Sequence, residues 1–305
     1  MSQRNEFFIP STDGRHKLHC ISYIPQNEPE KLFFIVHGMA EHIERYETFM
    51  QTLADNGFAV FAHDHVGHGK SVESDFELGF IAYQKGYKIL INDVDEVVKY
   101  GQKIYPSAKL VVMGHSMGSF IARLYARQYG DKLSGLIVMG TGGSNPAAGA
   151  GIAVADVVKS VRGKKRISPF VNKLAFGKYN EKTEKKTPFD WLSTNENEVK
   201  KYIEDRYSGF DFTASAMSDL IRLNKYSNKK DAYNVKKELN VFVVSGSEDP
   251  VGNYGKGPLE VCEKYRKAGV KSANVKLYEG ARHEILNDFV RDEVVNDILG
   301  FVSSL

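Results

Sequence analysis

A serine flanked by glycines follows a short apolar run in the stretch KLVVMGHSMGS, residues 109–119. The spacing Gly114-x-Ser116-x-Gly118 suits a sharp turn from a buried strand into a helix, because side chains at either glycine would collide with the neighbouring strand and helix. Such a turn lifts the serine Oγ clear of the sheet and places it at a helix N-terminus, where the peptide dipole favours developing negative charge. A tight turn with a capping serine would have the same sequence pattern. The predicted strand before Ser116 and the predicted helix after it favour a nucleophile.

A nucleophilic serine needs a base, and His283 is the one histidine that follows it. The chain has nine histidines, and the other eight precede Ser116. In strand–turn–helix sites of this kind the chain order is serine, then acid, then histidine. We therefore expect His283, in the stretch YEGARHEILND, to be the base; the alternative is an ordinary surface histidine.

The acid is chosen by its position after a predicted buried strand. Asp249 lies in VFVVSGSEDPVG, where Pro250 and Gly252 fix a rigid turn. Its role would be to hold the imidazole tautomer and to stabilise the imidazolium. The adjacent Glu248 could substitute for it, and an aspartate that bonds its own turn is a further alternative.

The oxyanion formed on attack needs two backbone N–H donors, each worth about 3–4 kcal/mol by donor removal. Met117, directly after the nucleophile, is expected to supply one. The other should come from the loop after the strand KLFFIVHG, where Met39 is the natural donor and Gly38 allows the backbone to approach closely.

The elements that must position these residues alternate along the chain between strands and helices. The sequence predicts an opening hairpin from EFFIP and KLHCISYIP, which the Asp-Gly turn of STDGRH joins. Later apolar runs predict strands at 31–38, 58–64, 109–114, 133–143, 239–249 and 274–280. Helical spacing of apolar residues predicts helices at 45–57, 86–105, 117–130, 258–268 and 285–302. This alternation indicates a mainly parallel sheet with helices on both faces.

The alternation breaks at residues 144–228, which we expect to form an inserted helical cap over a core made of 1–143 and 229–305. This segment has no strand-like runs and is made of the helical fragments AAGAGIAVADVVKSV, SPFVNKLAFG, ENEVKKYIEDRY and TASAMSDLIRLN. The first of them contains the small and apolar AAGAGIAVADVV. Between 159 and 186 it carries ten Lys or Arg and two Glu, a net charge of +8 in a chain of +3. An apolar helix beside cations suits an anionic lipid surface or a negatively charged head group. A solvated basic face around a packed helix is the alternative.

Composition limits the class of protein. With 305 residues, 42% hydrophobic and 26% charged, the chain should bury a core, and a net charge of +3 gives no reason to expect nucleic acid binding. Cys20 and Cys262 are too few for a disulfide framework or a zinc knuckle, which favours a reducing compartment. No signal-peptide core and no run of roughly 18 apolar residues is present, so we expect a soluble, cytoplasmic protein.

Two other motifs have spacings similar to those of cofactor sites. The HxHxxH spacing of His63, His65 and His68 in HDHVGHG is typical of metallohydrolase zinc loops, but a dinuclear site needs further ligands and only one histidine follows Ser116. The glycine-rich GTGGSNPAAGAG contains no GxGxxG, and no GxxxxGK[ST] occurs in the chain. We expect neither a metal nor an organic cofactor.

The stretches VHGMAEHIERY, DHVGHGKS, GHSMG, SGSEDPVG and GARHEILND resemble those of the α/β-hydrolase family of monoacylglycerol lipases, lysophospholipase-like esterases and serine aminopeptidases. The resemblance covers essentially the whole chain, including the cap stretch TPFDWLSTNENEVKKYIEDRYSGFDFT. It implies an α/β-hydrolase fold with an inserted cap, a triad of Ser116, Asp249 and His283, and an oxyanion hole at the N–H groups of Met39 and Met117.

The resemblance also implies a reaction. We expect hydrolysis of carboxylic esters through an acyl-enzyme, with a monoacylglycerol or lysophospholipid as substrate. The alternative is amide hydrolysis at a peptide N-terminus, which needs a carboxylate in the cap to hold the free amine. A zinc metallohydrolase and a catalytically silent binding protein are favoured less, the latter because all three triad positions hold reactive residue types. Val66 departs from the family pattern, where arginine is usual, and puts the packing of its loop in doubt.

Overall fold

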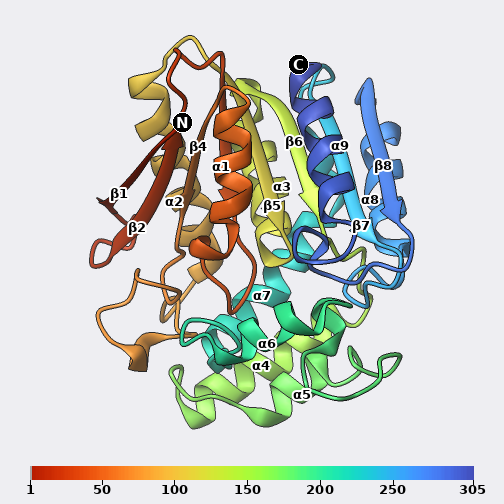
Figure 1. Cartoon of the computed structure of the whole chain (residues 1–305). Helices are drawn as coiled ribbons and strands as arrows, with labels where there is room; N and C mark the ends of the chain where they lie inside the picture. The colour runs from red at the N-terminus through yellow and green to blue at the C-terminus, as the bar shows by residue number, and fades with distance from the viewer. Residues whose placement is uncertain (1) are drawn as a thin grey trace.

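The structure is a computed structural model that describes residues 2–305, and its centre is one eight-stranded sheet (Figure 1). The strand order is β1-β2-β4-β3-β5-β6-β7-β8; β2 is antiparallel to both β1 and β4, and all other neighbours are parallel. The mainly parallel sheet and the opening hairpin are thus confirmed. The strands are β1 Gln3–Pro10, β2 Lys17–Ile24, β3 Lys31–Val36, β4 Phe58–His63, β5 Lys109–His115, β6 Leu133–Met139, β7 Asn240–Gly246 and β8 Ser272–Tyr278.

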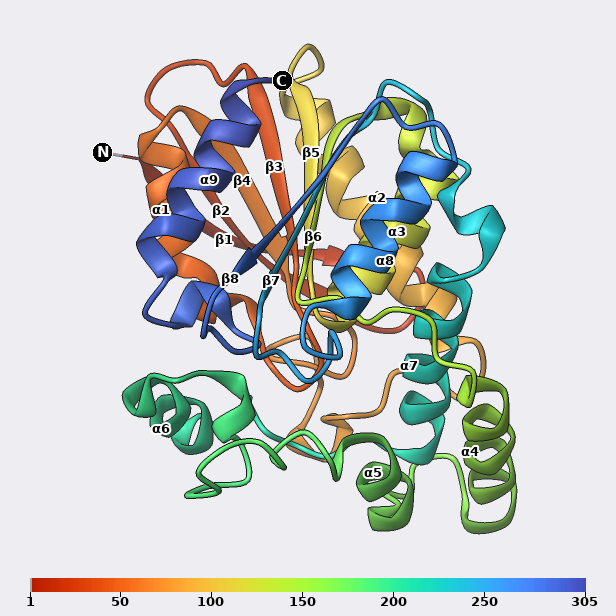
Figure 2. The ribbon, with the colours of Figure 1, turned by 90° about the vertical axis from the view of Figure 1, so that its right-hand side faces the viewer.

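Helices cover both faces of the sheet, as predicted. Figure 2 shows α1 (Glu47–Asp55) and α9 (Arg291–Ser303) on one face, and α2 (Gly86–Ile104), α3 (Met117–Tyr129) and α8 (Lys256–Lys267) on the other. Successive side chains of a strand point to opposite faces. In β5, alternate residues therefore enter two separate cores, one with α2, α3 and α8 and one with α1 and α9. This double burial explains why the strand before the GxSxG turn is continuously apolar.

Four helices lie between β6 and β7, and they gather at the carboxyl ends of the strands (Figures 1 and 2). They are α4 Ala148–Arg162, α5 Pro169–Phe176, α6 Glu196–Glu204 and α7 Ala214–Ser227. All four coincide with predicted helical fragments. The last one, α7, packs against α4 of this group and also against α2 and α3 of the core. The division at 144 and 228 remains a prediction.

The two ends of this insertion are bonded to each other over α3. Arg123, fully buried on α3, donates to the carbonyl of Ser227 and to Asn228 Oδ1 (3.0 Å). Asn228 Nδ2 in turn donates to the carbonyls of Gly142 (3.3 Å) and Gly143 (3.0 Å). The chain therefore leaves and re-enters the core at one anchored point. Within residues 2–305, no helix has both the length and the hydropathy that crossing a bilayer demands.

Candidate active site

Ser116 sits on the strained turn that the sequence predicts. Its backbone has φ 52° and ψ −119°, and it is the N-cap of α3. A Cβ at Gly114 would lie 2.2 Å from the carbonyl oxygen of Gly118, and a Cβ at Gly118 would lie 2.0 Å from that of Val36. The two glycines are therefore required because three backbone segments meet there without room for a side chain.

Asp249 and His283 lie in neighbouring loops, after β7 and after β8. His283 Nδ1 is 3.0 Å from Asp249 Oδ1, an ion-pair distance, although the N–H does not point directly at the oxygen. Both side chains are buried, whereas Glu248 is exposed. Burial alone would raise the pKa of Asp249, but the charge and contact of His283, with hydrogen bonds from the Val251 N–H and Ser245, hold that pKa below its usual value. The geometry thus favours Asp249 over Glu248 as the partner of His283.

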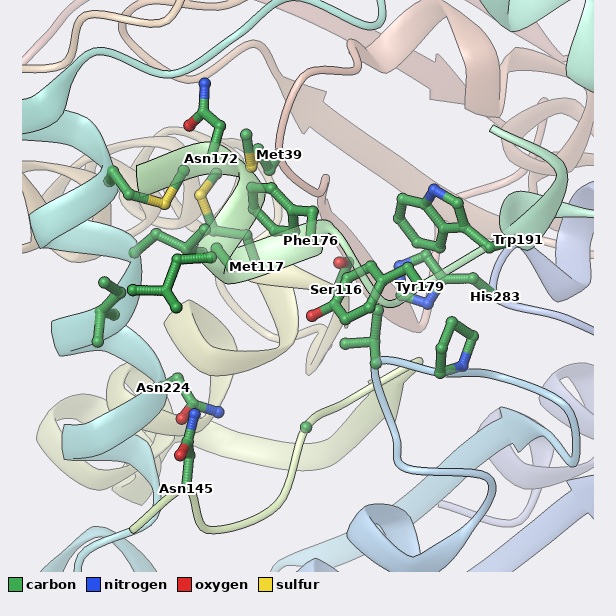
Figure 3. Close-up of a pocket in the computed structure, with 18 of the residues that line it drawn as sticks. Met39, Ser116, Met117, Asn145, Asn172, Phe176, Tyr179, Trp191, Asn224 and His283 are labelled. Atoms are coloured by element: carbon green, nitrogen blue, oxygen red, sulfur yellow. The ribbon is translucent and has the colours of Figure 1, made fainter. Parts of the chain in front are cut away.

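A cavity of about 920 Å³ brings the other predicted residues together. Met39, Ser116, Met117 and His283 all line it (Figure 3), while Asp249 lies behind His283. Its remaining walls come largely from the insertion, including residues of α4, α5 and α7. A space of this size is typical of sites for small organic ligands.

The backbone around Met39 approaches the nucleophile closely. A Cβ at Gly38 would lie 2.6 Å from Glu41 Oε1 and 3.0 Å from Ser116 Cβ, which is why the loop after β3 needs a glycine there. Within residues 2–305 the Met39 N–H donates no backbone hydrogen bond. Met117 opens α3, and first-turn N–H groups have no intrahelical partner. Both backbone N–H groups are thus available to donate to an oxyanion on a substrate bound beside Ser116.

A buried ion pair next to the nucleophile was missed by the sequence analysis. Glu41 accepts hydrogen bonds from Tyr46 Oη (2.9 Å), His115 Nδ1 (2.9 Å) and the Gly38 N–H. Burial would raise the pKa of Glu41, but the charge and hydrogen bond of His115 lower it to about 2. Burial would lower the pKa of His115, and the Glu41 carboxylate raises it instead. The only sequence feature that pointed to this ion pair was the position of Glu41 near Met39 and of His115 next to Ser116.

The candidate metal ligands His63, His65 and His68 form a buried cluster with His37. His37 and His65 have ring centroids 4.2 Å apart, and the backbone N–H of His65 donates to His37 Nε2 (3.0 Å). In the described part of the chain, no group of three or more His, Cys, Asp or Glu is arranged to hold a metal ion, so the geometry lends the zinc alternative no support. Val66 is fully buried in the core, which settles the doubt about the packing of this loop.

Comparison with known proteins points in one direction. Residues 27–289 match the family described as serine aminopeptidase, S33. The chain is 28% identical to the monoglyceride lipase of Mus musculus, over 97% of this chain and 88% of that protein. It is 25% identical to the monoacylglycerol lipase of Mycolicibacterium smegmatis, over 99% and 98%. Among solved structures, a thermostable carboxyl esterase from Bacillus coagulans in complex with glycerol has a TM-score of 0.93 and 30% identity, covering 99% of this chain and 98% of that one.

The histidine cluster predicts sensitivity to acid. Burial lowers the pKa of His63 and of His68 to about 4 from an ordinary 6.5. As pH falls, the unfolded chain therefore binds protons at these histidines before the folded chain does. Each histidine should remove about 1.4 kcal/mol of unfolding free energy per pH unit as pH falls from roughly 6.5 to 4. Urea denaturation at a series of pH values measures this slope. His68→Phe, whose new ring would lie against Phe210 and Phe212, should flatten the slope, and an unchanged slope would contradict the assignment.

Proposed function

Because this chain belongs to the α/β-hydrolase family described as serine aminopeptidase, S33, and is a carboxylic ester hydrolase, we propose that it hydrolyses monoacylglycerols or lysophospholipids through an acyl-enzyme on Ser116. One observation carries the proposal. Ser116 and His283 open onto the same cavity, and the His283 ring is paired at 3.0 Å with the buried Asp249.

In the proposed mechanism, His283 accepts the proton of Ser116 Oγ as that oxygen adds to the ester carbonyl carbon. The oxyanion accepts hydrogen bonds from the N–H groups of Met39 and Met117. His283 then gives the proton to the alcohol oxygen as the carbon–oxygen bond breaks. Water adds to the acyl carbon, His283 takes its proton, and the proton returns to Ser116 as the carboxylic acid leaves. Asp249 stabilises the imidazolium in both steps.

The wall contributed by α4 and α7 supports an acyl chain as the bound group. Most residues of this acyl wall are small or apolar, including Ala148, Gly151, Val154, Met217 and Ile221, and Asn224 is an exception. Burying methylene groups against such a wall gains about 0.8 kcal/mol each. Relatives named for monoglyceride and monoacylglycerol hydrolysis favour a lipid ester over other esters.

The amide alternative depends on a carboxylate in the insertion. Of the described cavity-lining residues between 144 and 228, Asp211 is the one carboxylate, and it is exposed to solvent. An exposed carboxylate holds an ammonium group weakly, because water screens the pair. Ester hydrolysis is therefore the better supported reaction.

The outer surface of α4 and α5 supports contact with a lipid surface. We call the exposed apolar side chains Val157, Val161, Ile167, Phe170 and Leu174 the α4–α5 face. Exposed cations lie between and after them in the same stretch of the chain, namely Arg162, Lys165, Arg166, Lys173 and Lys178. In Figure 2 both helices lie at the end of the molecule opposite the two chain termini. Exposed apolar groups together with cations suit an anionic bilayer surface.

Replacing the nucleophile tests the proposed chemistry directly. Ser116→Ala should lower kcat by around six orders of magnitude on p-nitrophenyl esters, as loss of a triad nucleophile does elsewhere. A fluorophosphonate probe should label the wild-type protein and not the variant. An amino-acid p-nitroanilide assayed beside the esters should be cleaved far more slowly. A variant that keeps a tenth of wild-type turnover would refute the role of Ser116.

Filling the cavity should shorten the acyl chain that the enzyme accepts. A Cβ at Gly151 would lie 3.5 Å from Ile221 Cδ1, ordinary contact, so a larger side chain there extends into the space beside α7. Gly151→Leu should lower kcat/KM for p-nitrophenyl palmitate by about tenfold or more, since a few displaced methylenes are worth that much. The butyrate ester should be hydrolysed as by wild type. Equal losses on both esters would contradict the placement of the acyl chain.

The α4–α5 face predicts salt-dependent vesicle binding. Val161→Asp combined with Phe170→Asp should reduce cosedimentation with phosphatidylglycerol vesicles, and added salt should weaken wild-type binding by screening. Phe289→Asp is a matched control, because Phe289 and Phe170 are both 65% exposed but Phe289 lies outside this face. Binding that neither salt nor the double substitution weakens would rule out the lipid-surface proposal.

A further inference from the structure

The single tryptophan of the chain lies against the proposed catalytic base. Trp191 belongs to the short turn Asp190–Leu192 of the insertion, and its ring centroid is 5.1 Å from that of His283, with the ring planes inclined at 41°. Figure 3 shows the two side chains facing each other at the edge of the cavity. The sequence analysis assigned this residue no role.

The residues on either side of the two rings are bonded to each other, once through a side chain and once through the backbone. Arg282 Nη1 donates to the carbonyl of Asp190 (2.9 Å), and the Glu284 N–H donates to the carbonyl of Leu192 (2.7 Å). The residues before and after Trp191 are thus held by the residues before and after His283. The indole position is therefore set relative to the imidazole.

The histidine ring has a second aromatic neighbour from the core. The His115 ring centroid lies 4.7 Å from that of His283, at 42°. His115 is held in turn by Glu41, while Asp249 lies at the Nδ1 side of His283. Three separate elements, β5, the loop after β7 and the insertion, thus restrict the orientation of one imidazole.

We propose that Trp191 is a positioning residue for His283, which holds the imidazole toward Ser116 and stabilises the imidazolium with the face of its indole ring. Aromatic pairs gain energy beyond the area they bury, and tryptophan is the best aromatic partner for a cation. The stabilisation grows when His283 takes the proton of Ser116, so it favours the transition state over the resting enzyme. The inference rests on the proposed function, since it assumes that His283 is the base.

The kinetic test compares two substitutions. On p-nitrophenyl butyrate, a short ester that makes little use of the acyl wall, Trp191→Leu should lower kcat by about tenfold with KM within about twofold. Trp191→Phe keeps an aromatic ring and should restore most of kcat. A Trp191→Leu enzyme with kcat within twofold of wild type, or a Trp191→Phe enzyme as impaired as Trp191→Leu, would overturn the proposal.

Phe189→Leu provides the matched control for general damage to the insertion. Phe189 lies two residues away in the same segment, but its ring packs against Tyr202 at 5.1 Å instead of against His283. Melting temperatures of the two leucine variants should fall comparably, while kcat should fall more for Trp191→Leu. Equal losses of kcat would mean that Trp191 acts through packing alone and would overturn the proposal.

Because Trp191 is the only indole, its fluorescence provides a readout that does not depend on activity. An imidazolium quenches indole emission more than a neutral imidazole does, so emission should rise as pH rises through the acid limb of kcat/KM. Several titratable or charged groups face His283 or its immediate neighbours and could shift the midpoint: Asp249, His115, Glu41, Arg282, Glu284 and Tyr179. His283→Ala, which keeps the indole, should abolish the titration. A titration that persists in His283→Ala would overturn the proposal.

Fluorophosphonate labelling separates this inference from the proposed function. A wild-type protein that is not labelled at Ser116 removes the proposed function, whatever Trp191 does. Labelling in wild type together with unchanged rates in Trp191→Leu removes only the positioning role. Labelling that slows in Trp191→Leu and recovers in Trp191→Phe supports both.

Discussion

The close approach of three backbone segments at residue 116 is the constraint on which the site depends. The ends of β3 and β5 and the start of α3 meet where only hydrogen fits at Gly114 and Gly118. The parallel register pairs Val36 with Gly114, and the Ser116 N–H donates to the Met139 carbonyl (3.0 Å), so the sheet itself holds the turn. A non-glycine residue at positive φ costs about 1–3 kcal/mol and persists only where its surroundings fix it. The strain is thus carried by the central strands, and its result is a serine directed into the cavity.

Buried charges connect the loops that the strands bring together. Glu41, two residues after Met39, pairs with His115, which directly precedes Ser116. Arg45 reaches from Glu41 (3.7 Å) to Glu284, which directly follows His283. Removing one member would leave its partner buried with an unpaired charge, at a cost of about 3–5 kcal/mol. The network therefore fixes the proposed oxyanion loop, nucleophile and base in relation to one another, and Glu41, His115 and Glu284 also line the cavity.

Features that depend on the spacing of neighbouring residues were predicted from the sequence. Contacts that depend on the path of the insertion were missed. The steric need for glycines around Ser116, the parallel sheet and the four helices of the insertion all follow from neighbouring residues. The predicted strand at 133–143 was too long, because Gly140 adopts φ 57° and turns the chain away after Met139. The contact between Trp191 and His283 joins residues 92 positions apart and depends on how the insertion folds back, which no local pattern records. The HxHxxH spacing did not indicate a metal site. Burial keeps these imidazoles neutral, and their rings pack on one another.

The insertion is held to the core in two different ways, and this difference separates its two proposed roles. The segment around Trp191 is bonded to the loop of His283, with further ties from Thr194 to Asp288. The polar ties of α4 run to α7 instead, through Asp156 and its ion pair with Arg222 (2.6 Å). A displacement of α4 on a lipid surface would therefore change the acyl wall while leaving the imidazole in place. The segment around Trp191 is thus fixed to the loop of His283, whereas α4 is attached to another helix of the insertion. Helix α5 lies between the two, because Phe176 packs on Tyr179 (5.5 Å) and Tyr179 packs on Trp191 (5.0 Å).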